Sequence, residues 1–384
     1  MSVPDQLRDV FSARLGRESQ EVRAERLRIR AFLDDSLADG RFEPKSDSWL
    51  SGYSPAFSRL LGEQGWIGMT WPAEFGGRGA APDLRYAVVE ELLAAGAPVA
   101  AHWFADRQVG PSLLRHGTAD QQRRLLPGIA AGRTYFCIGM SEPESGSDLG
   151  SVRTRARRVA GGWLVSGSKI WTSHADRAHY MLSLVRTGAA EDATAVALTQ
   201  VIIDMGDPGV VVRPIKTLDG QAHFCEVFLD DVMVGDDMLL GEPGCGWPQV
   251  LSELTFERSG PERFLTTFPL IREFVAALPE LDEGRADDLG RLISRLGTLR
   301  AMSGRVNARL ATDAPPGLAA ALVKDAGTRF EQDTVQIVRR WLGPDNPALG
   351  ATLEYVLAHA PNFTLRGGTN EILRNIIGKE VLAP

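Results

Sequence analysis

The spacing of apolar residues divides the chain into three stretches of different character. From residue 1 to about 132, apolar positions recur three and four apart, as in residues 86–95, which predicts helices. Between about 133 and 238 the apolar runs are short and bounded by Gly, Asp or Thr, which predicts strands. From about 247 to the end the helical spacing returns.

The predicted elements define an α+β fold. Several short strands with no helix between them favour an antiparallel sheet or a small barrel. We therefore expect an N-terminal α-helical domain (1–132), a middle antiparallel β domain (133–238) and a C-terminal helical bundle (239–384). The predicted strands span residues 162–167, 180–185, 194–203 and 209–214, and the later helices 250–264, 289–310, 318–342 and 351–359.

Composition places the chain among globular proteins. Of its 384 residues, 44% are hydrophobic and 24% are charged, which is typical of soluble domains. No apolar run approaches the roughly 18 residues needed to cross a bilayer, and the first residues lack the pattern of a secretory signal. We expect a cytoplasmic protein that has no membrane partner.

Charge and metal-ligand spacing argue against two further classes of protein. The net charge of −7, from 49 acidic and 42 basic residues without a dense basic block, argues against a nucleic-acid partner. The six histidines show no metal-ligand spacing, and Cys137, Cys225 and Cys245 are too scattered for a disulfide framework or metal site. We expect no metal, and cysteines that are buried.

Three segments carry candidate chemistry. Residues 140–148 (MSEPESGSD) offer backbone N–H groups and hydroxyls to a polar ligand, although they also fit an ordinary capped turn. Trp171-Thr172-Ser173 offers an indole that can stack on a planar ring and hydroxyls that can bond its heteroatoms, although Trp171 also fits a core position. Gly367-Gly368-Thr369 precedes an amphipathic helix, so it fits either a ligand-binding helix N-terminus or a simple cap.

Together with the α–β–α order, the segments SEPESGSD (141–148), KIWTS (169–173) and GGTNEILRNIIGKEVL (367–382) resemble the acyl-CoA dehydrogenase family over essentially the whole chain. The resemblance implies bound FAD, an acyl-CoA substrate and an electron-transfer flavoprotein as the electron acceptor. It implies that the residues around the flavin are Met140, Ser141, Gly146, Ser147, Trp171, Thr172, Ser173, Thr369 and Glu371. Ser147 would also lie near the thioester ligand.

The catalytic base has two possible positions in this family. Many members place a glutamate directly before the Gly-Thr of the C-terminal motif, where this chain has Gly367, whose N–H could only polarise the thioester carbonyl. A second branch places the base on the helix that opens the C-terminal domain, in a Glu-Arg pair. Glu257-Arg258 matches that pair. Glu257 also fits a solvated helix charge. We predict Glu257 as the base, and Arg258 either contacts CoA or makes a structural ion pair.

The adenosine half of the expected flavin site departs from the family. Homotetramers of the family bind the adenosine of FAD with an Arg-x-x-Phe-Gly segment and a Gly-Gly-Asn-Gly loop that follows a Gln-Ile pair. After Gln336-Ile337 this chain instead reads VRRWLGPDNP, without a double glycine. The loss on one side favours a heteromer, like the α2β2 dehydrogenases of bacterial steroid degradation, in which a partner supplies these contacts. A homodimer or homotetramer with a changed pocket is the alternative.

Two other functions remain open at this point. The flavin could serve a carrier-protein thioester or oxygen chemistry, or the chain could be the non-catalytic subunit of a heteromer. A base on the helix leaves room near Gly367 for a branched or bulky acyl group, such as a steroid side chain, in place of a simple fatty acid.

Overall fold

The computed structural model describes residues 18–188, 198–278, 282–310, 317–342 and 346–382, and gives only the backbone of 254–257 and Leu310. The chain forms two compact units. The helical unit comprises Met1–Gly52, Ala80–Pro98 and Leu254–Pro384, and the β unit comprises Tyr53–Gly79 and Val99–Glu253. The domain boundaries at 132 and 238 stay a prediction.

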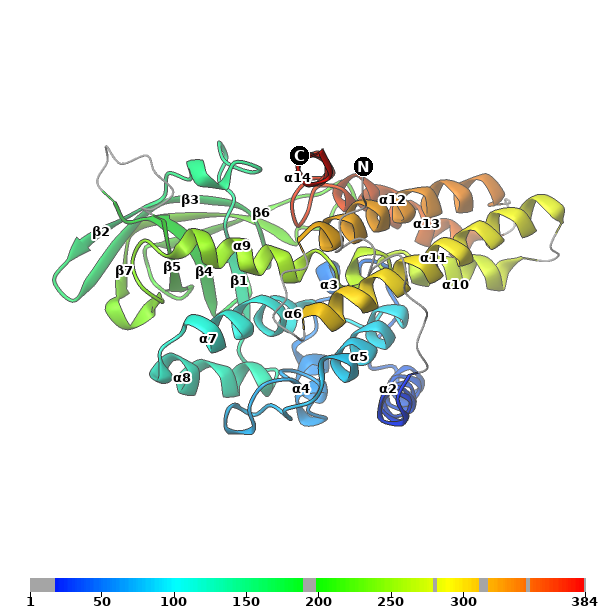
Figure 1. The fold of residues 1–384 in the computed structure, drawn as a ribbon, viewed down its shortest axis with the longest axis horizontal. Coiled ribbons are helices and arrows are strands. Elements are labelled where there is room, and N and C mark those ends of the chain that lie inside the picture. Colours follow the sequence, from blue (N-terminus) through cyan, green and yellow to red (C-terminus); the bar gives the residue numbers. More distant parts are fainter. Residues whose placement is uncertain (1–17, 189–197, 279–281, 311–316, 343–345, 383–384) are drawn as a thin grey trace. The chain divides into compact units, whose positions relative to one another are not determined.

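The β unit is built on an eight-stranded sheet (Figure 1). Its strand order is β6-β7-β3-β2-β4-β5-β8, and β1 pairs with β4. The predicted change from helical to strand structure in the middle of the chain is confirmed. The strands are β1 (Phe136–Gly139), β2 (Arg155–Val159), β3 (Gly162–Ser173), β4 (Tyr180–Arg186), β5 (Leu198–Asp204), β6 (Val210–Ile215), β7 (Phe224–Gly235) and β8 (Leu239–Leu240).

Two pairings in this sheet differ from the purely antiparallel prediction. The first strand, β1, runs parallel to β4, with Phe136 opposite Tyr180, and β2 meets β4 in parallel at Arg155 and Arg186. A strand's residue period does not reveal the direction of its neighbour, so the sequence could not show this. Almost every residue of β4 and β5 is buried, which explains their continuous apolar runs.

Short helices complete the β unit. These are α4 (Pro55–Glu63), α6 (Ala100–Phe104), α7 (Gly110–His116), α8 (Ala119–Ala130) and the first turns of α9 (Gly246–Glu257). A capping box between Thr118 and Gln121 begins α8. The Gln121 side chain also donates to the carbonyls of Asp237 (2.8 Å) and Leu239 (2.6 Å), which ties this helix to the end of the sheet.

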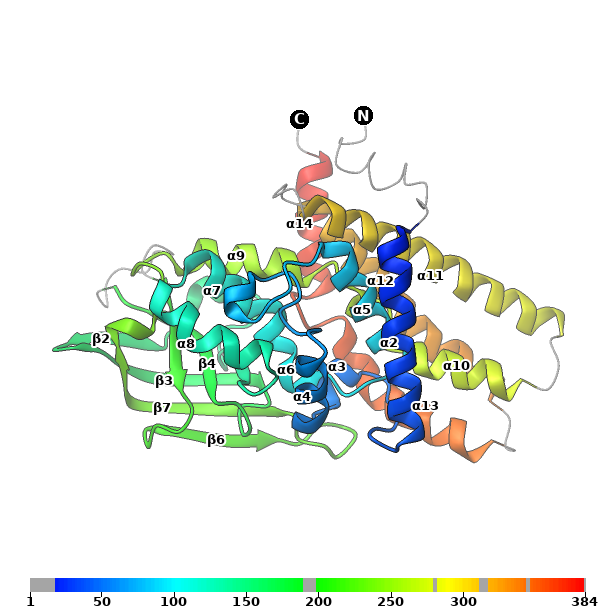
Figure 2. The same cartoon turned by 90° about the horizontal axis from the view of Figure 1, so that it is seen from below.

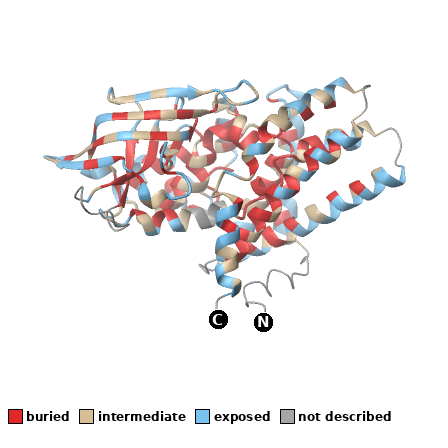
Figure 3. Ribbon diagram, turned by 90° about the horizontal axis from the view of Figure 1, so that it is seen from above, coloured by how far each residue is buried: buried red, intermediate tan, exposed pale blue. Residues whose placement is uncertain are grey.

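In the helical unit, three helices pack around an apolar core formed by residues of 268–277, 317–341 and 347–363; buried residues are red in Figure 3. Leu270, Phe274, Val338, Leu353 and Phe363 belong to this core. Among the described helices, none is long and apolar enough to cross a membrane. As Figure 2 shows, the unit contains α2 (Gln20–Ala38), α3 (Ser48–Ser51), α5 (Pro82–Ala94), α10 (Phe268–Ala277), α11 (Glu283–Leu310), α12 (Gly317–Trp341), α13 (Pro347–Phe363) and α14 (Asn370–Leu382).

Two sequence expectations were wrong. The helix predicted over 250–264 ends at Glu257, because Gly260-Pro261 interrupts it and a 3₁₀ turn follows at Pro261–Arg263. Cys137 and Cys225 are buried as predicted, whereas Cys245 is exposed because it lies in the turn before α9.

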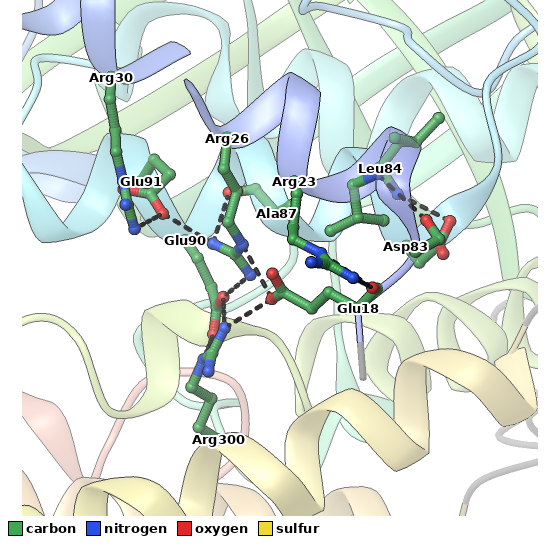
Figure 4. A network of polar contacts seen from close by, with 12 residues as sticks. Glu18, Arg23, Arg26, Arg30, Asp83, Leu84, Ala87, Glu90, Glu91 and Arg300 are labelled. Carbon is green, nitrogen blue, oxygen red and sulfur yellow. Dashed lines mark hydrogen bonds and ion pairs between the residues drawn. The ribbon is translucent and has the colours of Figure 1, made fainter. Parts of the chain in front are cut away.

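A buried ion-pair network joins α2, α5 and α11 (Figure 4). Arg26 is 8% exposed and Glu90 5% exposed. The guanidinium of Arg26 pairs with Glu90 and donates to Glu91 Oε1 (2.8 Å), while Arg300 Nε donates to Glu90 Oε1 (2.8 Å). Glu90 therefore accepts from two arginines on different helices, so its charge is balanced only when all three helices are in place.

We predict that Glu90→Gln lowers the free energy of unfolding by about 3 kcal/mol, because it leaves the buried guanidinium of Arg26 short of a counter-charge. Urea denaturation measures this. Arg30→Gln is the control: Arg30 also donates to Glu91 but its side chain is 57% exposed, so the loss should be under about 1 kcal/mol. Equal losses for the two variants would contradict the prediction.

Candidate active site

The loop that follows β1 forms a tight turn beside the end of β3. Glu142 N donates to Ser145 O (2.8 Å) and Ser145 N donates back to Glu142 O (3.0 Å). Gly146 and Ser147 at the tip are exposed, and Ser141 O accepts from Ile170 N (2.9 Å). The structure thus brings the two motifs of the β domain together, although 29 residues separate Met140 from Lys169.

A bulge at the end of β3 turns Trp171 outward. The register between β3 and β7 shifts between Lys169 and Thr172, and Trp171 adopts a left-handed φ of 60°, which is costly for a bulky residue. Its indole is 56% exposed, so the alternative of a core tryptophan is wrong. Phe224 supports it edge-on at 5.9 Å.

A buried ion pair fixes the loop to the strand. Lys169 is fully buried, and its Nζ donates to Glu142 Oε1 (2.8 Å), Leu184 O (2.6 Å) and Met140 O (3.3 Å). Burial alone would raise the pKa of Glu142, but Lys169 and the N–H groups of Arg153 and Thr154 hold it below its usual value. The carboxylate therefore stays charged.

In the helical unit, a double-glycine turn leads into α14. Gly367 and Gly368 have φ values of 70° and 86°, a region that favours glycine. Arg258 Nε lies 3.4 Å from Gly367 O. Thr369 caps the helix by accepting from Ile372 N (3.3 Å), and Glu371 stands exposed in the first turn, where the helix dipole favours a carboxylate.

Three family models match successive parts of the chain. The acyl-CoA dehydrogenase N-terminal domain matches residues 19–133, the middle domain 137–232 and the C-terminal domain 282–382. The chain belongs to the acyl-CoA dehydrogenase family. It is thus related to oxidoreductases, as the sequence resemblance implied.

Individual relatives agree with this placement. Acyl-CoA dehydrogenase IpdE1 of Mycobacterium tuberculosis is 33% identical over 383 residues, covering 94% of this chain and 98% of the relative. A solved structure described as the Tcur3481-Tcur3483 steroid ACAD has 27% identity and a TM-score of 0.84, covering 96% of this chain and 98% of its own. The ChsE4-ChsE5 complex from Mycobacterium tuberculosis has 25% identity and a TM-score of 0.79, covering 97% and 99%.

In this acyl-CoA dehydrogenase, a buried polar cluster anchors the double-glycine turn through the preceding residue. Arg366 Nη1 donates to Asp47 Oδ1 (2.6 Å), and its guanidinium stacks on Trp49, 4.4 Å from the ring centroid. His359 Nδ1 donates to the other oxygen of Asp47 (2.9 Å). Burial alone would raise the pKa of Asp47, but Arg366 and His359 hold it below its usual value.

Sequence reasoning found the loop, the strand end and the glycine turn but missed the charges that support them. Lys169, Glu142, Asp47 and Arg366 find their partners only in the folded chain. A lysine within the apolar strand at 169 was the one visible signal. The predicted base, Glu257, is the last residue of α9, and its side chain lies outside the described residues.

Glu331 gives the anchor a pH dependence that can be tested. It is fully buried and accepts from Thr266 N (2.8 Å), and burial raises its pKa to about 7 against the pull of Arg366, whose Nη2 lies 4.0 Å away. Between about pH 4.5 and 7 the folded chain therefore holds a proton that the unfolded chain has lost. This group's stabilisation falls as pH rises through that window.

We predict that Glu331→Gln flattens the dependence of unfolding free energy on pH between about 5 and 7. In the wild type, the contribution of Glu331 to the free energy of unfolding should fall by at most about 1.4 kcal/mol per pH unit, because one proton is involved. Urea denaturation of both proteins at pH 5, 6, 7 and 8 gives the difference. Parallel curves would mean that the Glu331 carboxyl is already ionised at pH 5.

Proposed function

We propose that this chain catalyses the FAD-dependent α,β-dehydrogenation of a bulky acyl-CoA, with Glu257 as the base. The observation that carries the proposal is the outward-facing Trp171 ring at the strand end that the 140–148 loop contacts. In the β unit Thr172 is fully buried, yet its Oγ1 has no hydrogen-bond partner among the described residues. A buried hydroxyl without a partner costs free energy, but this one has almost no exposed surface, so a ligand heteroatom could bond it only after the strand end opens locally.

FAD fits the chemistry of this edge. Trp171 offers an aromatic face, Thr172 and Ser173 offer hydroxyls, and the exposed turn at Gly146 and Ser147 offers backbone N–H groups suited to phosphate. Met140 and Ser141 would line the same ring from the loop. In the helical unit, Thr369 and Glu371 are the corresponding candidates. When bound, FAD accepts the hydride from the substrate β-carbon.

The protein's own task is to remove the α-proton and to hold the thioester. Gly367 carries no acid–base group, so its N–H can only polarise the thioester carbonyl. Arg258, whose Nε lies 3.4 Å from Gly367 O, is the candidate for contact with CoA. Glu257 directly precedes it as the last residue of α9, and a carboxylate is the group that can accept the α-proton.

We predict that Glu257→Gln abolishes reduction of the flavin by acyl-CoA while FAD stays bound, because the amide cannot accept the α-proton. The rate of anaerobic flavin bleaching should fall at least about 100-fold. Glu242→Gln, outside the proposed site, is the matched control and should bleach at the wild-type rate. Undiminished bleaching by Glu257→Gln would favour a non-catalytic role for this glutamate.

The substrate class can be read from the same spectra. A base on α9 leaves the position before Gly368-Thr369 without a side chain, which makes room for a branched or steroid acyl group. The similarity to a structure described as a steroid ACAD supports this. Bleaching by steroid acyl-CoA but not by straight-chain acyl-CoA is the expected pattern, with electron-transfer flavoprotein as the proposed acceptor. Bleaching by a carrier-protein thioester alone, or turnover that needs oxygen, would favour the alternative function.

We predict that co-expression with a second acyl-CoA dehydrogenase-like subunit raises the FAD content of the purified protein several-fold. The chain lacks the family's double-glycine loop after Gln336-Ile337, so a partner would supply the adenosine contacts in an α2β2 assembly. The similarity to the ChsE4-ChsE5 complex supports this. The ratio of flavin to protein absorbance measures occupancy, and full loading of the chain expressed alone would favour a homomer.

A further inference from the structure

We propose that Lys169 and Glu142 are positioning residues for the flavin, because their buried ion pair holds the loop at 140–148 at a fixed place beside Trp171. This rests on the proposed function, in which the loop and the strand end contact the same ring. Neither residue belongs to the set that would touch FAD. Their effect is to fix the backbone of Met140 and Ser141 against β3.

Lys169 has an acceptor for each of its three N–H groups. Glu142 Oε1 lies at 2.8 Å, Leu184 O on β4 at 2.6 Å and Met140 O on the loop at 3.3 Å. The side chain is fully buried, so no water replaces a lost acceptor. One ammonium group thereby connects the loop, β3 and β4, and it is charge-assisted in its bond to the carboxylate.

Glu142 closes the loop on itself. Its Oε2 accepts from Arg153 N (2.6 Å) and its Oε1 from Thr154 N (2.9 Å). These residues follow Glu142 by 11 and 12 positions, so the carboxylate joins the two ends of the segment whose tip is Gly146 and Ser147. Ordering this segment before FAD arrives removes an entropy cost from binding.

A second contact holds the far end of the same segment. Arg186 on β4 donates through Nη2 to Gly150 O (2.9 Å) and through Nε to Val152 O (3.2 Å). Apolar residues of similar volume can stabilise a fold as well as a buried ion pair does. Apolar replacements could not bond the Met140 carbonyl or the N–H groups of Arg153 and Thr154. They could keep the fold stable, but they would not hold the loop in this position.

The charge state of Lys169 supplies a signature that a packing role would not have. Burial lowers its pKa to about 8, although Glu142 opposes the shift. From the loop it faces the Glu142 carboxylate and the Met140 carbonyl, and from β4 the Leu184 carbonyl. A neutral amine has two N–H groups for these three acceptors, so one contact is lost above about pH 8. If FAD binds only the form with a charged Lys169, binding above about pH 8 requires Lys169 to take up a proton, and the affinity falls.

The experiment measures FAD dissociation constants from flavin fluorescence between about pH 6.5 and 9.5, with the protein prepared alone or co-expressed, whichever form holds FAD. We expect Lys169→Met and Glu142→Gln to weaken binding at pH 7 by about tenfold or more. The wild-type constant should rise several-fold above about pH 8. Lys169→Arg keeps its charge at every pH, so its constant should show no such rise even if its size weakens binding overall.

The control is Lys216→Met, which removes an exposed lysine outside the sheet pairings and should leave both affinity and pH profile unchanged. Circular dichroism melting identifies any variant that fails to fold, and the Lys169→Arg profile then decides the outcome. Wild-type affinity and pH profile in Lys169→Met would overturn the inference, as would the same rise above pH 8 in Lys169→Arg. Wild-type protein that binds no FAD in either form would instead overturn the proposed function.

Discussion

The candidate site at the edge of the β unit depends on one buried ammonium group shared by three acceptors. Lys169 Nζ contacts Glu142 Oε1 (2.8 Å), Leu184 O (2.6 Å) and Met140 O (3.3 Å) inside the protein. Because an uncompensated charge there would be very costly, the loop cannot leave β3 without a large loss of free energy. The bulge that turns Trp171 outward starts at this lysine, so one side chain fixes the loop and marks where the strand opens.

In the helical unit, an arginine holds the glycine turn as Lys169 holds the loop of the β unit. Arg366 holds the turn at Gly367 by its bond to Asp47 Oδ1 (2.6 Å) and by stacking on Trp49. Both anchors place a desolvated cation one or two residues from a backbone segment with left-handed φ values. At Trp171 the φ of 60° is strained for a bulky residue. Such backbone persists only where its surroundings enforce it, and a charge with fixed partners provides that enforcement more directionally than apolar packing does.

Local chemistry in the sequence was enough to predict the order of helices and strands. It was not enough to predict the contacts between residues far apart in the chain. Apolar spacing located β3 to β6, but it extended the helix after Val250 past Glu257 because Phe256 and Phe264 fit the same period. The exposure of Trp171 could not be predicted from the residue alone, because a tryptophan also fits a core position. The bulge in β3 is what leaves it 56% exposed. No local pattern shows that Lys169 and Glu142, 27 residues apart, share a bond.

The backbone of the glycine turn bears on where a base can stand. Gly367 has a φ of 70° and is followed by Gly368 at 86°, so a glutamate at 367 would pay a strain of about 1 kcal/mol or more. The turn therefore suits a site whose base comes from another element, and the proposed base, Glu257, is the last residue of α9.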